Sequence, residues 1–311
     1  FLRKMMSILT AGAMMAAGAL TGGALPGAWI ATAAAESGTP IYQASDLFSE
    51  RDLKQEADVS DAERLTVTDG AELRITEAGV YVLSGTASEA TVYVEAAKDA
   101  KVQLVLDGLR ITNSSAPCIY VRSADKVFVT TAADSSLAVT GKFDANDKAD
   151  GAIFSRDDLV LNGTATLTVV SSDNGVVGKD DLKVTGGTYM VTAASKAFEA
   201  NDSIRIMDGT FEIQAGTDGL HAENNDDKTK GYVYIGGGRF TMTCGDDGIH
   251  ATCVAQADDG DITMTAREGL EATYIQINGG TLNIQATDDG INAANKTSAV
   301  ETAVEIAGGA V

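Results

Sequence analysis

The chain has 311 residues, with 44 Asp and Glu against 23 Lys and Arg, so its formal net charge is −21. This charge argues against nucleic acid as a partner, because binding to phosphates needs clustered Lys and Arg. Two His and three Cys are too few for a zinc ribbon or a dense disulfide framework. The hydrophobic share of 44% is that of a chain that folds, whereas aromatic residues make up 5%.

Residues 1–35 have the pattern of a secretory signal peptide. Arg3 and Lys4 precede an apolar run of small residues, which ends in Ala33-Ala34-Ala35 before Glu36. Signal peptidase accepts such an end. A membrane span is the alternative, but glycines and a proline interrupt the run and no charged stop follows it. We therefore expect a secreted, extracellular protein with no membrane span in the mature chain. Because the sequence stops inside a repeat, we also expect it to be part of a longer product.

The second half of the chain repeats itself about every 22 residues. One glycine position, called the glycine slot below, recurs in each repeat, and Ala197 fills it in one of them. The glycines are Gly151, Gly175, Gly219, Gly248, Gly269 and Gly290. Short runs that alternate apolar and polar residues, such as Leu182-Lys183-Val184, predict strands. Units this short cannot bury a core alone, but stacked units can. The pattern predicts an all-β parallel β-helix over residues 65–311, preceded by a linker or N-terminal cover over residues 36–64.

Acidic residues recur at one corner of the predicted coils. Equivalent residues of successive coils lie about 4.8 Å apart, so stacked carboxylates repel one another unless they are solvated, protonated or bridged by a cation. Clusters of carboxylate oxygens suit calcium. We predict calcium at this corner, and solvated Asp-Gly turns are the alternative. The candidate ligands lie one or two residues before the glycine slots or two residues after them: Glu199, Asp218, Asp246, Asp247, Glu268, Glu271, Asp288 and Asp289.

Both histidines of the chain also follow a glycine slot by two residues. His221 and His250 should therefore stack in neighbouring coils. We expect outward-facing, solvated side chains, and the alternatives are a metal pair or a contact with a sugar.

Several motifs together carry a resemblance to a known family. They are Val105-Leu106-Asp107-Gly108, Lys179-Asp180-Asp181-Leu182-Lys183 and Asp246-Asp247-Gly248-Ile249-His250-Ala251. From about Asp58 to Val311 the chain resembles a family of secreted bacterial carbohydrate-binding proteins, whose fold is a right-handed parallel β-helix like that of polysaccharide lyases. The resemblance implies bound calcium and attachment to cellulose or acidic plant polysaccharide such as polygalacturonate, without a known hydrolytic activity. Arg267 departs from the double-Asp motif and weakens one ligand position.

The first strand of each repeat is expected to present a row of side chains that suit sugars. Cations, amides and tyrosines contact sugar carboxylates, hydroxyls and ring faces. A generic solvated sheet face is the alternative. The predicted sugar-binding residues are Lys183, Arg205, Tyr232, Tyr234, Gln256, Tyr274 and Gln276. Bound calcium would offset the repulsion between this acidic chain and polygalacturonate.

The sequence therefore predicts a non-catalytic protein that binds plant cell-wall polysaccharide. No Ser-His-Asp or nucleophilic Cys arrangement appears. A calcium-dependent uronate lyase is one alternative, with Arg267 or Lys196 as the base. A structural adhesin without saturable sugar binding is the other.

Overall fold

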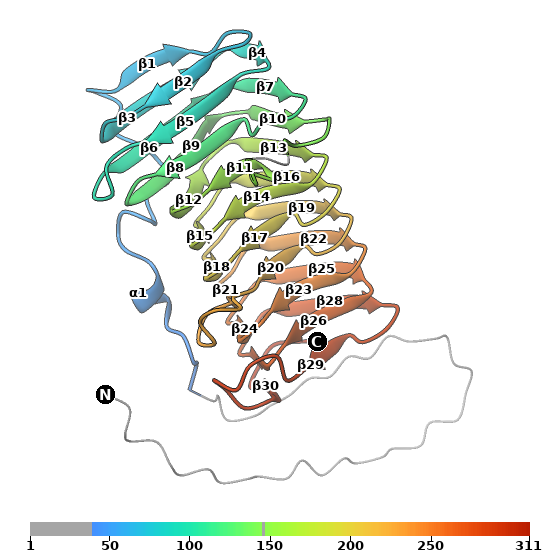
Figure 1. Cartoon of the computed structure of the whole chain (residues 1–311). Helices are drawn as coiled ribbons and strands as arrows, with labels where there is room; N and C mark the ends of the chain where they lie inside the picture. The colour runs from blue at the N-terminus through green and yellow to red at the C-terminus, as the bar shows by residue number, and fades with distance from the viewer. Residues whose placement is uncertain (1–38, 145–146) are drawn as a thin grey trace, which may run out of the picture. The chain divides into compact units, whose positions relative to one another are not determined.

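The described residues fold as a parallel β-helix. The structure is a computed structural model that describes residues 39–144 and 147–311, so the predicted signal peptide lies outside the described residues. In this part of the chain the strands form three parallel sheets of eleven, ten and nine strands. Each strand pairs with its equivalent one coil further on (Figure 1), as when β12 pairs with β15 and β13 with β16. The predicted all-β solenoid is confirmed.

The eleven-stranded and ten-stranded sheets form two of the three faces of the solenoid. The eleven-stranded sheet contains β1 (Glu63–Thr66), β3 (Gly79–Ser84), β6 (Lys101–Asp107), β9 (Lys126–Ala133), β12 (Asp158–Gly163), β15 (Asp181–Val184), β18 (Ser203–Ile206), β21 (Tyr232–Ile235), β24 (Val254–Ala257), β27 (Tyr274–Ile277) and β30 (Ala303–Ile306). The ten-stranded sheet contains β2 (Glu72–Ile75), β5 (Thr91–Glu95), β8 (Ile119–Ser123), β11 (Gly151–Ser155), β14 (Asn174–Gly178), β17 (Phe198–Ala200), β20 (Leu220–Ala222), β23 (Asp247–Ala251), β26 (Glu268–Ala272) and β29 (Ile291–Ala293).

The nine-stranded sheet closes each coil. It contains β4 (Thr86–Ser88), β7 (Arg110–Asn113), β10 (Ser135–Val139), β13 (Thr166–Ser171), β16 (Thr188–Ala193), β19 (Thr210–Ala215), β22 (Arg239–Cys244), β25 (Asp261–Ala266) and β28 (Thr281–Ala286). Its strands alternate buried and exposed residues most regularly, as the pattern of β19 shows. One face of this sheet therefore packs inside the coils and the other faces water.

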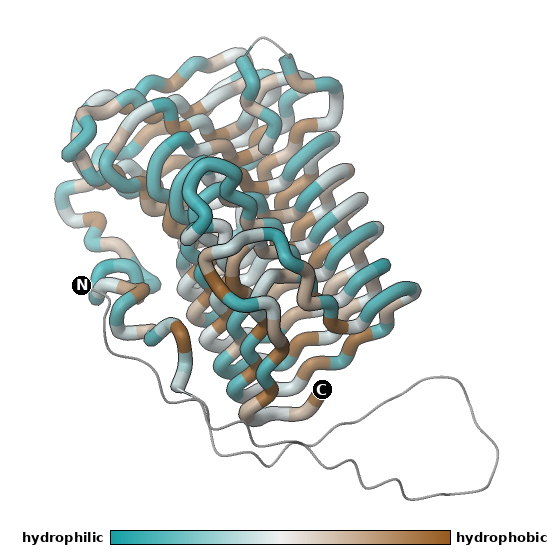
Figure 2. Tube along the Cα trace, turned by 60° about the horizontal axis from the view of Figure 1, so that its bottom comes forward, coloured by the Kyte–Doolittle hydropathy of each residue, from teal (hydrophilic) through white to brown (hydrophobic). Residues whose placement is uncertain are grey.

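Apolar side chains fill the interior in rows that run from coil to coil. Figure 2 shows hydrophobic residues recurring along the stacked strands while hydrophilic residues gather at the turns. Leu159, Leu182 and Ile204 occupy equivalent positions of the eleven-stranded sheet, and each is 0% exposed. Phe211 and Phe240 stack with ring centroids 4.5 Å apart. Each row gains its burial from the neighbouring coil, which is why a single 22-residue unit is not a stable fold.

The repeated glycines are required by the spacing between coils. A Cβ built on Gly219 would lie 2.7 Å from the carbonyl oxygen of Gly248, and one built on Gly248 would lie 2.8 Å from that of Gly269. Carbon atoms do not approach backbone oxygen so closely without a shift of the chain. The glycine column thus allows the corner between the nine-stranded and ten-stranded sheets to close tightly.

Residues 39–56 lie along the outer face of the eleven-stranded sheet and include the short helix α1 (Ala44–Leu47). Figure 1 shows this N-terminal segment in blue beside the strands. It contacts coils far apart in the solenoid, from Gly163 of β12 to Gln276 of β27. Within the described ranges, no helix is long and apolar enough to cross a bilayer.

Candidate metal and polysaccharide site

A ladder of polar side chains stands on the outer face of the ten-stranded sheet. Glu199 of β17 is in register with His221 of β20, which is in register with His250 of β23, followed by Glu271 of β26. The residues directly before these four, such as Leu220 and Ile249, point into the core. Since strand side chains alternate between faces, the ladder must point outward. The stacking predicted from the glycine spacing is confirmed.

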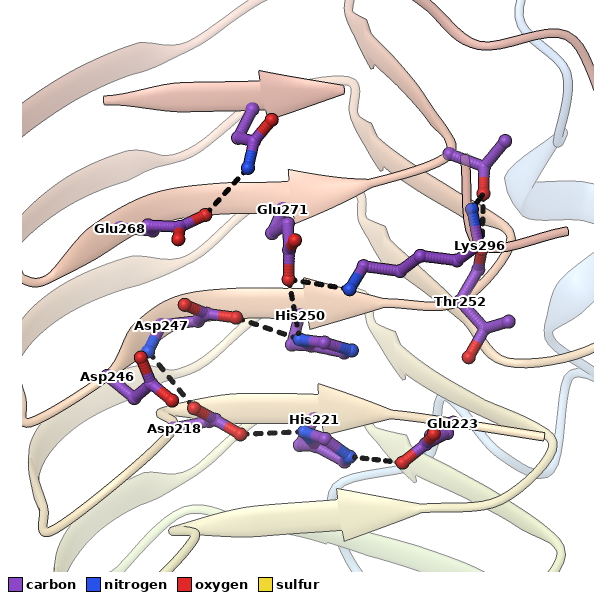
Figure 3. Close-up of polar contacts among 12 residues, drawn as sticks. Asp218, His221, Glu223, Asp246, Asp247, His250, Thr252, Glu268, Glu271 and Lys296 are labelled. Atoms are coloured by element: carbon purple, nitrogen blue, oxygen red, sulfur yellow. Dashed lines mark hydrogen bonds and ion pairs between the residues drawn. The ribbon is translucent and has the colours of Figure 1, made fainter. Parts of the chain in front are cut away.

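The two histidines pack against carboxylates rather than against water (Figure 3). Their ring centroids are 4.5 Å apart at 20° between planes. The Nδ1 atom of His221 lies 2.7 Å from Oδ2 of Asp218, and that of His250 lies 2.8 Å from Oδ2 of Asp247. His221 is only 6% exposed. The expectation of solvated histidines is wrong, because each imidazole is held by an acid three residues earlier and covered by the adjacent coil.

Additional carboxylates flank the imidazole pair. Oε2 of Glu271 lies 3.2 Å from Nδ1 of His250, and Nζ of Lys296 lies 2.8 Å from the same Glu271 oxygen. On the other coil, Oε2 of Glu223 lies 3.3 Å from Nε2 of His221. Acids therefore flank the histidines on both coils, and Lys296 supplies a positive charge beside Glu271.

The pKa values of the two buried aspartates, Asp218 and Asp247, are shifted in opposite directions. Burial alone would raise the pKa of Asp218, but the hydrogen bonds with His221 and with the backbone N–H of Asp247 hold that pKa below its usual value. Burial raises the pKa of Asp247, and the charges of Asp218 and Asp246 add to this rise against the effect of His250. The Oδ1 atom of Asp247 is buried and has no hydrogen-bond partner. This oxygen is available to a cation.

Arg267 neutralises much of the acidic corner. Its guanidinium lies 2.5 Å from Asp246, 2.8 Å from Glu268 and 3.1 Å from Asp288. These acids had been expected to need calcium as their counter-charge. Asp289 is exposed beside this group. Arg267, which departs from the repeat, thus supplies part of the positive charge that calcium was predicted to supply at this corner.

Three of the predicted ligands form an oxygen-only cluster. Carboxylate oxygens of Asp218, Asp246 and Asp247 lie within 4.8 Å of one another. Three carboxylates, one of them with the unpartnered buried oxygen, fit part of the shell of six to eight oxygens that calcium takes. Glu199 lies apart from this cluster, because Lys179 at 2.8 Å and Lys196 at 3.5 Å engage its carboxylate.

The predicted sugar-binding row stacks as expected but is not an open surface. Lys183, Arg205, Tyr234, Gln256 and Gln276 are in register along the eleven-stranded sheet. The N-terminal segment covers them, and Tyr234, Gln256 and Gln276 are only 1–2% exposed. The expectation of a solvent-facing row is therefore wrong.

The side chains of this row bind the N-terminal segment. The amides of Gln256 and Gln276 bond the backbone of Tyr42 and Ile41, Tyr42 stacks on Tyr232 at 4.3 Å, and Nζ of Lys183 bonds Asp52 at 2.9 Å. Tyr274 remains partly exposed, and its hydroxyl donates to Glu305. A sugar reaches most of the row only if the segment leaves.

The sequence allowed residues 36–64 to be a linker or a cover, but it did not indicate which face they cover or through which contacts. Asp52, Tyr42 and Gln55 lie in a segment without periodicity, so no repeat pattern indicated their partners. One signal was present: Tyr232, Tyr234 and Val254 make this face more apolar than a solvated sheet face needs to be. Such a patch indicates that another part of the molecule packs over it.

Comparisons with known proteins identify the family. Residues 69–311 match the profile of the family described as "Carbohydrate-binding domain-containing protein". The chain belongs to this carbohydrate-binding domain family. A relative with the same description, from Acetivibrio thermocellus, is 33% identical over an alignment of 201 positions that covers 62% of this chain and 70% of the relative.

A solved structure supports the same assignment. It is described as the polysaccharide lyase-like protein from C. thermocellum, in a gadolinium derivative. The TM-score is 0.62 with 28% sequence identity, over 74% of this chain and 99% of that chain. The family description supports a non-enzymatic binding role, whereas the lyase-like description of the neighbour leaves catalysis as an alternative.

Proposed function

We propose that this chain is an exported, non-catalytic protein that attaches to plant cell-wall polysaccharide, either cellulose or acidic chains such as polygalacturonate. The observation that carries the proposal is the family match over residues 69–311. An exported role agrees with the signal-peptide pattern of residues 1–35.

The sugar site that the geometry favours is the outer face of the ten-stranded sheet. The ladder there combines carboxylates and imidazoles with Lys179, Lys196 and Lys296, which are 24–29% exposed at their side chains. Lysines suit the carboxylates of an acidic sugar, and partly exposed carboxylates accept hydrogen bonds from hydroxyls. A polymer lying along the solenoid axis would meet equivalent groups about every 4.8 Å. The row on the eleven-stranded sheet is a less suitable site because the N-terminal segment occupies it.

Calcium is part of this proposal. Asp218, Asp246 and Asp247 are the residues that would hold it, because their oxygens lie together and one buried oxygen has no partner. Calcium at this corner would supply positive charge beside the sugar face and open coordination positions for uronate carboxylates.

A uronate lyase is the second candidate, and the lyase-like neighbour is the observation that favours it. Arg267 is a poor base, because hydrogen bonding to Asp246 raises the pKa of its guanidinium further above its usual value. Lys196 remains as the candidate base. Formation of unsaturated product from polygalacturonate, followed by ultraviolet absorbance, would support this alternative, especially if it is lost in Lys196→Gln.

The binding experiment uses the purified chain, titrated with polygalacturonate and sedimented with cellulose, each with calcium and with chelator. We expect saturable binding to at least one polymer, and chelator should weaken binding to the acidic one. The double variant Lys179→Gln/Lys196→Gln should bind polygalacturonate about tenfold more weakly, the order expected for lost charged hydrogen bonds. Lys54→Gln changes an exposed lysine of the N-terminal segment and serves as the control. Absence of binding to both polymers would leave the structural adhesin instead.

A further inference from the structure

The imidazole pair gives one cluster a donor set that calcium does not favour. Side chains from three consecutive coils meet there: Asp218 and His221, then Asp247 and His250, then Glu271. Two overlapping groups within this set, Asp218–His221–His250 and Asp247–His250–Glu271, each offer three ligand atoms within 4.8 Å of one another. Calcium selects oxygen, whereas a borderline divalent ion accepts both imidazole nitrogen and carboxylate oxygen.

The Nδ1 atom of His250 faces two carboxylates at once. It lies 2.8 Å from an Asp247 oxygen and 3.2 Å from a Glu271 oxygen. A ring nitrogen carries at most one hydrogen, so it cannot donate a full bond to both carboxylates. A divalent cation at this point satisfies both acids and uses the nitrogen lone pair as well.

The second observation is a buried oxygen of Asp247 that has no hydrogen-bond partner. Asp247 is 3% exposed and its Oδ1 atom has no hydrogen-bond partner. The nearest cation is Arg267, whose Nη2 lies 3.9 Å from this oxygen. Burying a carboxylate oxygen without a partner is unfavourable unless a ligand completes it.

The spacing of the donor atoms suits a small ion. Zinc binds nitrogen and oxygen at about 2.0–2.2 Å, which places neighbouring ligand atoms roughly 3–3.5 Å apart. The measured separations at the two histidines, 2.7, 2.8 and 3.2 Å, are close to this range. Only small side-chain movements are needed to enclose an ion.

We propose that Asp218, His221, Asp247, His250 and Glu271 form a binding site for a borderline divalent cation such as zinc. This site shares Asp218 and Asp247 with the proposed calcium corner but differs from it in its nitrogen ligands. An ion held by either three-residue group joins two adjacent coils and thereby stabilises their stacking. The site does not require the proposed sugar binding, so failure of one leaves the other unaffected.

Spectroscopy tests the nitrogen ligands directly, because these are the two histidines of the whole chain. The protein, purified without a histidine tag and stripped of metal, is loaded with one equivalent of Cu²⁺ and measured by pulsed electron paramagnetic resonance. We expect couplings from imidazole nitrogens, weakened in His250→Gln. Because copper binds such sites more tightly than zinc, zinc should displace the copper signal only in large excess, whereas calcium in the same excess should not displace it.

Matched variants test the carboxylates. Asp247→Asn should lower zinc affinity at least tenfold, about the loss caused by altering groups around metal sites. Asp261→Asn removes an equal charge at a partly exposed position outside the cluster, where Asp261 pairs with Arg239, and should leave the affinity unchanged. A copper spectrum with oxygen ligands alone, displacement of zinc by equal calcium, or equal zinc affinity in wild type and His250→Gln would each overturn the proposal. Thermal unfolding of the metal-free variants establishes that they are folded.

Discussion

Asp180 and Asp202 form a carboxyl pair on adjacent coils. Asp180 directly precedes β15 and Asp202 directly precedes β18, so stacking brings the two side chains together. Burial raises the pKa of Asp180 to about 7, and its hydrogen bond with Asp202 and the charge of Asp158 add to the rise. The pKa of Asp202 is held low, since its bonds with Asp180 and Lys230 outweigh burial. The pair shares one proton.

This pair makes the free energy of unfolding depend on pH. An unfolded Asp releases its proton near pH 3.9, whereas folded Asp180 keeps it to about pH 7. Between these values the folded chain holds more protons, so its contribution to stability is present at low pH and is lost as pH rises. Urea unfolding of Asp180→Asn should show a smaller decrease in stability between pH 4 and pH 7 than wild type. Asp259→Asn, an exposed change of equal charge, should keep the wild-type slope; equal slopes in all three proteins would contradict the shared proton.

Single residues also decided how the acidic corner is neutralised. The repeat predicted stacked acids correctly, since Asp247 is in register with Glu268. Arg267 then supplies the counter-charge to three of the acids around it. The sequence placed Arg267 beside the corner but did not indicate its rotamer, because a long side chain can turn toward water or toward any of several neighbours.

At the scale of the strand and turn, replacing a glycine of the column by alanine should lower the free energy of unfolding most where the next coil approaches most closely. In Gly219→Ala the new methyl group meets the Gly248 carbonyl oxygen at 2.7 Å and Sγ of Cys244 at 3.0 Å. Overpacking of this kind costs about 1–3 kcal/mol. We expect a loss of that order in the free energy of unfolding, measured by denaturant titration.

Gly290 provides the matched control in the same column. A Cβ there lies 4.0 Å from its nearest neighbour, Cγ2 of Ile284. Gly290→Ala should therefore cause no loss of stability, and the lower backbone entropy of unfolded Ala can even increase it slightly. Similar losses of unfolding free energy in both variants would indicate that glycine is needed for the turn conformation rather than for the close approach of the next coil.

At the scale of the whole described unit, the N-terminal segment connects coils that otherwise contact only their neighbours. Solenoid stability is normally a sum of coils and nearest-neighbour interfaces. Here Gln55 bonds Thr185 and Gly163 near one end of the segment, and Ile41 bonds Gln276 near the other. The buried pair of Asp52 and Lys183 lies between them. The segment therefore couples coils across much of the solenoid.

Comparing chains that begin at residue 39 and at residue 57 tests this coupling. The shorter chain should unfold less cooperatively, with a broader denaturant transition, because the long-range contacts are lost. Hydrogen exchange should accelerate in β21, β24 and β27, whose outer face becomes exposed, while β19 and β22 on another sheet change little. Identical exchange in both chains would show that the segment covers the face without stabilising it.

The sequence by itself determined the solenoid and its registers. A coil is a local repeat, and equivalent residues of adjacent coils must stack, so the ladder Glu199, His221, His250 and Glu271 followed from glycine spacing. Tertiary structure alone decided which faces are open. Tyr42 and Gln256 are 214 residues apart, and their contact depends on a non-periodic segment whose partners no repeat encodes. The burial of the histidines depends likewise on carboxylate rotamers, which three-dimensional packing sets.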